Sequence, residues 1–176
     1  MKRIFVIATL LLAPGIVLAE TPYAGMQGRP VKALSEQQIA DLNTGRGMGM
    51  ALAAELNGYP GPSHVLELAD KLELTPDQTL AVRNLFESMK RDSIPLGTKL
   101  IEQEKELDRQ FATHTITPES LRDATAAVAK TQGELRETHL RYHLSTAALL
   151  DPAQMQRYAS LRGYADAPAH HHHHHN

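Results

Sequence analysis

Leu74-Thr75-Pro76-Asp77-Gln78 begins the stretch that decides the fold, because about 35 residues with apolar positions at helical spacing follow it. Thr75 supplies a side-chain oxygen for an N-cap, and Gln78, three residues later, can return a hydrogen bond to the cap's own N–H. Pro76 occupies the first helical position, where a missing N–H costs nothing. The pattern therefore predicts a long, capped helix that begins at Pro76.

The same pattern occurs twice more, at residues 34–38 and 150–154. Ser35 is followed by Gln38 in the first copy, and Asp151 by Gln154 in the last. Both Ser and Asp carry the oxygen that an N-cap needs. The repeat therefore predicts three helices that begin with the same type of capping box.

The remaining chain also divides into helical segments, and no segment alternates like a strand. The expected helices span residues 35–42, 51–56, 63–72, 76–111, 118–150 and 152–162, with a flexible glycine-rich junction at 45–50. Pro95 should kink or break the long helix near residues 91–93. We expect an all-α protein in which two long antiparallel helices form a hairpin and shorter helices cover its ends.

The ends of the chain are expected to lie outside the folded domain. Residues 1–19 have the charged start, short apolar run and small-residue site of a signal peptide, with cleavage after Ala19 and an uncleaved anchor as the alternative. Residues 20–34 are expected to form a flexible arm, 35–164 a single helical domain, and 165–176 a disordered tail. A signal peptide of this kind predicts a periplasmic protein that is soluble after cleavage.

Composition narrows the function. Without Lys2 and Arg3 the remaining chain has a net charge of about −4, which does not favour nucleic acid as a partner. The chain has no cysteine, so it has neither a disulfide nor a catalytic thiol. It also lacks a recognisable catalytic triad, pair of acids or cofactor loop, and we do not expect an enzyme.

His139 and His143 are the strongest candidates for chemistry. Their i, i+4 spacing places two imidazoles on one face of a helix, which suits chelation of a metal. Leu140 stands where a zinc metalloprotease has its glutamate base, so peptidase chemistry is rejected. The alternative is structural, since His139 shares an apolar stripe with Leu135 and Tyr142 and can be an ordinary interface histidine.

Other side chains are candidates to complete such a site. His64, just after a Pro-Gly-Pro turn, is the preferred third ligand, and His114, in the expected hairpin turn, is a weaker candidate. An oxygen ligand can come from Glu55, Glu67 or Asp70. Imidazole accepts Zn, Cu, Ni and Co alike, so the metal stays open, and no organic cofactor is expected.

The terminal histidine run is either a native metal-binding tail or an expression tag, and both readings stay open. Its members are His170, His171, His172, His173, His174 and His175.

The repeated Leu-Thr-x-x-Gln pattern resembles that of the Spy/CpxP family of periplasmic proteins, and the resemblance covers roughly residues 34–163. It is fully met at residues 74–78, whereas Ser35 and Asp151 replace the threonine in the other copies. The family includes ATP-independent chaperones and heavy-metal sensors that resemble CnrX and ZraP. The resemblance implies a Spy/CpxP-like helical hairpin with His139 and His143 as ligands of a divalent metal.

Two functions follow as expectations. The first is a stress-response protein that senses or resists a heavy metal, with additional chaperone activity. The second is a metal-independent chaperone or signalling adaptor. Expected partners are unfolded or envelope proteins and a membrane sensor, and a thin hairpin with an uncovered apolar face leaves homodimerisation open.

Overall fold

The computed structural model describes residues 23–164, and within this range every regular element is a helix. The elements are η1 (Met26–Gly28), α1 (Glu36–Thr44), α2 (Leu52–Glu55), α3 (Pro62–Glu67), α4 (Pro76–Ala112), α5 (Pro118–Ala147) and α6 (Pro152–Leu161). The expected all-α fold is confirmed. The predictions of a signal peptide and of a histidine-rich tail lie outside the described residues.

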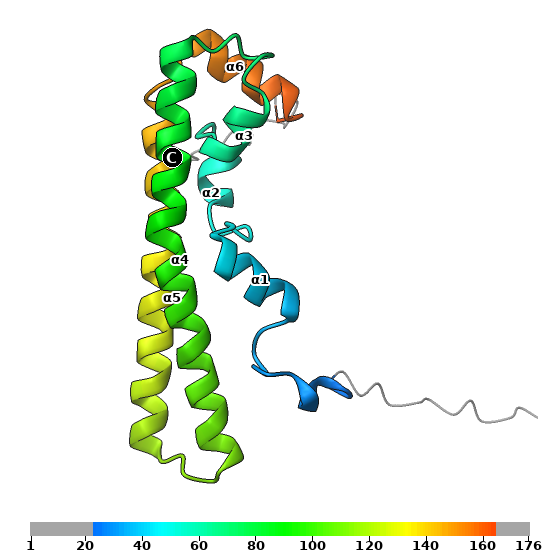
Figure 1. The fold of residues 1–176 in the computed structure, drawn as a ribbon, viewed down its shortest axis with the longest axis vertical. Coiled ribbons are helices and arrows are strands. Elements are labelled where there is room, and N and C mark those ends of the chain that lie inside the picture. The colour runs from blue at the N-terminus through cyan, green and yellow to red at the C-terminus, as the bar shows by residue number, and fades with distance from the viewer. Residues whose placement is uncertain (1–22, 165–176) are drawn as a thin grey trace, which may run out of the picture.

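Helices α4 and α5 form the antiparallel hairpin, and they lie side by side along most of the molecule (Figure 1). Helix α4 runs for 37 residues through Pro95, so the predicted break near residues 91–93 is wrong. Proline removes only one backbone hydrogen bond. The buried side chains on either side of it, Met89 before and Leu100 after, offset that loss by packing.

All three predicted capping boxes form. The side-chain oxygens of Ser35, Thr75 and Asp151 each accept from the backbone N–H three residues on. The glutamine of each box returns a hydrogen bond to the cap. The last two boxes also meet in space, because the side-chain amides of Gln78 and Gln154 pair at 2.9 Å. This pair joins the start of α4 to the start of α6.

Two local predictions need correction. The helix expected over residues 63–72 is shorter and begins one residue earlier, because α3 covers Pro62–Glu67 with Gly61 as its N-cap and Pro62 in the first helical position. The part of the arm directly before α1 is not flexible as predicted, because Val31 is fully buried and Leu34 is only 9% exposed. Lys32 pairs with Asp108 of α4 at 2.9 Å. Burial of its apolar residues fixes this segment against the hairpin.

Helices α1, α2 and α3 follow one another along one side of the hairpin, and α6 lies at the end opposite the hairpin turn (Figure 1). They build two apolar clusters. The first comprises Val31, Leu34, Leu42, Leu100, Ile101, Val128 and Leu135. The second comprises Val65, Leu72, Val82 and Tyr158.

Both clusters take residues from α4, and Met89 lies between their contributions along that helix. The predicted apolar stripe of α4 does not remain buried to its ends, because Leu80 and Phe111 are more than half exposed. The buried part of α4 therefore stops short of both ends of the helix.

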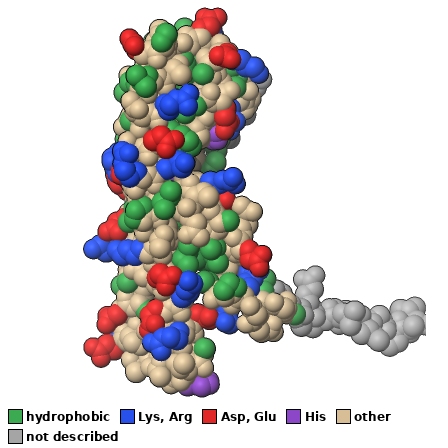
Figure 2. Space-filling model, in the orientation of Figure 1, with side chains coloured by type: hydrophobic (Ala, Val, Ile, Leu, Met, Phe, Trp, Pro, Cys, Tyr) green, Lys and Arg blue, Asp and Glu red, His purple; other side chains and the backbone are tan. Residues whose placement is uncertain are grey.

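Charged side chains of both signs are spread along the face drawn in Figure 2, with hydrophobic side chains between them. Among the described helices, none is long and apolar enough to span a membrane.

Candidate metal-binding site

His139, His143 and His64 line one cavity of about 240 Å³, together with Glu55 and Met89. Leu135 is the last residue of α5 in the first apolar cluster, and His139 and His143 lie on the next two turns of the helix. The cavity therefore lies between the two clusters, where α2 and α3 cover the hairpin. The fold brings together the three histidines that the sequence ranked highest.

His139 is 2% exposed, and its Nε2 has no hydrogen-bond partner among residues 23–164. A glycine packs over its ring, because a Cβ at Gly47 would lie 3.6 Å from Nδ1. Burial, and secondarily the nearby His143, lower the pKa of His139. The imidazole is therefore neutral at pH 7, the form that binds metals.

His143 is held more firmly. Its Nδ1–H donates to the carbonyl oxygen of Tyr59 at 2.7 Å, and the ring packs against the backbone of Gly61. This hydrogen bond fixes the tautomer in which Nε2 carries the free lone pair. Metal-ligating histidines are commonly oriented in this way, with the second ring nitrogen donating to a backbone carbonyl.

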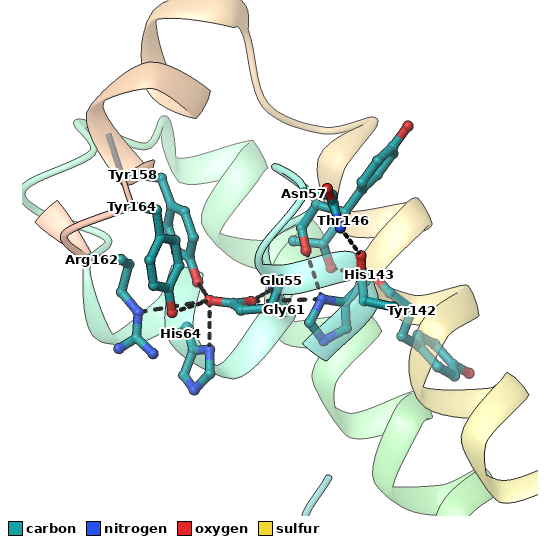
Figure 3. Close-up of polar contacts among 12 residues, drawn as sticks. Glu55, Asn57, Gly61, His64, Tyr142, His143, Thr146, Tyr158, Arg162 and Tyr164 are labelled. Atoms are coloured by element: carbon teal, nitrogen blue, oxygen red, sulfur yellow. Dashed lines mark hydrogen bonds and ion pairs between the residues drawn. The ribbon is translucent and has the colours of Figure 1, made fainter. Parts of the chain in front are cut away.

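Glu55 joins the histidines from α2 and is 5% exposed. Its carboxylate lies 3.3 Å from Nδ1 of His64 and 3.7 Å from Nδ1 of His143, and it accepts the N–H of Gly61 (Figure 3). Burial raises the pKa of this carboxyl, but the adjacent His64, together with hydrogen bonds from Tyr158 and Gly61, outweighs burial and brings the pKa to about 2. Glu55 is therefore a buried anion near neutral pH.

His64 completes the group from α3. Its side chain is 36% exposed, and its Nδ1 lies beside the Glu55 carboxylate without forming a hydrogen bond. Because it lies at the solvent side of the cavity, His64 has the most freedom to reorient.

Within residues 23–164 no three His, Asp or Glu side chains already converge as a complete metal cluster. The set of donors nevertheless fits a borderline divalent cation, since imidazole and carboxylate are its usual ligands. The orphaned Nε2 of His139 is the most direct sign of this fit. Binding would require side-chain rotation, which the cavity volume allows and the exposure of His64 favours.

The other predicted candidates are not part of the cavity. His114 is exposed in the turn between α4 and α5, at the far end of the hairpin, with a positive φ of 55°. Of the three candidate acids, only Glu55 lines the cavity, and both Glu67 and Asp70 are exposed. The histidines of the tail, 170–175, lie outside the described residues.

Sequence reasoning missed two contributions to this region. Met89 has only the sequence signal of an apolar position in the long helix, yet it lines the same cavity as His139. Tyr158, Tyr164 and Arg162 all reach Glu55 from α6 and the residues after it. A tyrosine pair at the end of a short helix gives no sequence signal of a partner about a hundred residues away.

Comparison of the chain with models of protein families, with curated proteins and with solved structures finds no match. The case for a function therefore rests on the site itself and on the motif resemblance.

Proposed function

We propose that this protein is a periplasmic stress-response protein that binds a divalent heavy metal ion, Zn, Cu, Ni or Co. His139 and His143 would be the principal ligands, with His64 as the third. The role would be that of a metal sensor or resistance factor of the Spy/CpxP type, with accompanying chaperone activity. Its expected partners are unfolded or envelope proteins and a membrane sensor.

The observation that carries the proposal is the orphaned Nε2 of His139, 2% exposed beside a cavity that two other histidines line. A buried polar atom without a partner costs about 1–3 kcal/mol. Such a cost is unusual in a native interior and calls for an explanation. A metal ion that takes the lone pair of this nitrogen supplies one.

Metal binding would also have a structural effect. His139 and His143 belong to α5, whereas His64 belongs to α3 and the adjacent Glu55 to α2. An ion shared among them would tie the two short helices to the hairpin. Occupancy of the site would thereby change the surface that this side of the hairpin offers to a partner.

Calorimetric titration with zinc, copper and nickel tests the proposal. The protein is the chain from Glu20 with residues 170–175 replaced by serine, so that the tail contributes nothing. The parent should bind at least one metal with micromolar or tighter affinity, and the double variant His139→Ala, His143→Ala should lose that binding. The control His114→Ala should bind as the parent does. Equal affinity in the parent and the double variant would refute the site.

A metal-independent chaperone or adaptor is the second candidate, and one observation favours it. Four large apolar side chains between residues 48 and 59 are 38–57% exposed, namely Met48, Leu52, Leu56 and Tyr59. Clustered exposed apolar side chains are typical of surfaces that bind other proteins. An aggregation assay with an unfolded client protein tests this function. It would be supported if the parent and the double variant suppressed aggregation equally, with or without metal.

A further inference from the structure

Glu55 has a second set of neighbours that the proposed function does not use. The hydroxyls of Tyr158 and Tyr164 both donate to its Oε1, the second at 3.3 Å, and Nε of Arg162 lies 3.7 Å from the same oxygen. In Figure 3 these three side chains approach the carboxylate from the side of α6. A single buried carboxylate thus contacts both the end of α6 and the histidines of the cavity.

The two ends of α6 are held in different ways. Its first turn is anchored to α4 by the amide pair of Gln154 and Gln78, neither of which lines the cavity. At its last turn, Tyr158 is 2% exposed and packs in the second apolar cluster, with its hydroxyl directed at Glu55. The polar attachment of residues 158–164 to the body of the protein therefore runs mainly through Glu55.

Tyr158 has the properties of a fixed donor. Burial and the adjacent Glu55 carboxylate raise the pKa of its hydroxyl, so it stays protonated at any physiological pH. A protonated hydroxyl that is locked by packing holds the carboxylate in one rotamer. In that rotamer the other carboxylate oxygen, Oε2, lies on the side of His143 and accepts from Gly61.

We propose that Tyr158 is a positioning residue for the metal site, which orients Glu55 toward His64 and His143 and so links metal occupancy to the end of α6. The inference rests on the proposed function. Partners of this kind typically contribute 10- to 100-fold to metal affinity, because they set the orientation and basicity of a ligand. By thermodynamic reciprocity, a bound metal stabilises residues 158–164 by the same coupling free energy.

The first test compares Tyr158→Phe with Tyr142→Phe in zinc titrations of the chain with the serine-substituted tail. Tyr142 is a matched control, since it is also buried, 7% exposed, and its hydroxyl donates to Asp92 rather than Glu55. Zinc affinity should fall at least tenfold in Tyr158→Phe and stay within twofold in Tyr142→Phe. Tyr164→Phe, which loses a longer hydrogen bond, should show a smaller loss and serves if Tyr158→Phe does not fold.

The second test needs no variant. Hydrogen–deuterium exchange of the parent, with and without zinc, should show slower exchange for residues 158–164 in the zinc-bound protein. A merely structural role of Tyr158 would lower stability without this zinc-dependent protection.

The outcomes separate the two proposals. Unchanged zinc affinity in the tyrosine variants, or unchanged exchange of residues 158–164, would overturn the role of Tyr158 while leaving the histidine site intact. Absence of zinc, copper and nickel binding in the parent would overturn both.

Discussion

Replacement of Gly61 by alanine should disturb the site through one side chain, that of His143. A Cβ at position 61 would lie 2.8 Å from both Cε1 and Nε2 of the imidazole, which is shorter than any ordinary carbon contact. The backbone of Gly61 has a φ of −81°, so alanine meets no conformational barrier of its own there. The effect of the substitution is therefore steric and falls on the ring.

The expected change in the free energy of unfolding has three contributions. Overpacking a well-packed interior costs about 1–3 kcal/mol. Displacing the ring from the Tyr59 carbonyl also loses one hydrogen bond, worth about 1 kcal/mol. Alanine also lowers the entropy of the unfolded chain, which stabilises the folded protein by about 0.4–1 kcal/mol. The free energy of unfolding should fall by about 1–3.5 kcal/mol, and zinc affinity should fall with it.

Denaturation by urea, followed by circular dichroism, measures the change, and Gly133→Ala is the matched control. Gly133 lies inside α5, is exposed, and a Cβ there meets nothing within 4 Å. The control should gain about 0.5–1 kcal/mol, because alanine favours the helix. If Gly61→Ala is as stable as Gly133→Ala and keeps zinc affinity, the packing of His143 against Gly61 is not as described.

Three further predictions concern stability. His139→Leu should raise the unfolding free energy of the metal-free protein by about 1 kcal/mol, because it removes the unpartnered nitrogen. The same substitution should weaken metal binding. A lower stability of the variant in thermal melts would contradict this prediction. The pKa of Glu55 is lowered to about 2 in the folded protein, so the ionised carboxylate stabilises the fold above pH 4.5. This contribution to the free energy of unfolding, at most about 3 kcal/mol, should be lost as the pH falls toward 2. Glu55→Gln should flatten that part of the stability–pH curve. A smaller dependence should remain from Glu106, whose pKa is also about 2 but whose ion pair with Arg109 is exposed and screened by solvent. An unchanged curve would show that Glu55 is not responsible. A double-mutant cycle of Gln78→Ala and Gln154→Ala should give a coupling of about 0.5–1.5 kcal/mol, and additive effects would rule out the amide pair.

The sequence predicts the helices well because their start signals are local. Capping oxygens and the glutamine three residues later lie within one turn, so the boxes at Ser35, Thr75 and Asp151 could be placed without tertiary information. The same reasoning fails where packing decides. Pro95 does not end α4, and Val31 of the arm is buried, because contacts distant in sequence stabilise both segments.

The candidate site is predictable only in part for the same reason. The i, i+4 spacing identifies His139 and His143 as neighbours on a helix, since helical geometry alone fixes it. The choice of Glu55 over Glu67 and Asp70 depends on how α2 and α3 cover the hairpin, which no local pattern reveals. The tyrosines that reach Glu55 come from α6 and from the residues after it, and they lie 103 and 109 positions later in the chain.

X-ray absorption spectroscopy at the zinc edge tests the central claim most directly, on the zinc-loaded chain with the tail histidines replaced by serine. The account predicts scattering from at least two imidazoles with Zn–N distances of about 2.0–2.1 Å. It also predicts that this signal disappears in the His139→Ala, His143→Ala variant. A spectrum with only oxygen ligands, or one that the double substitution leaves unchanged, would contradict the claim that this cavity binds metal.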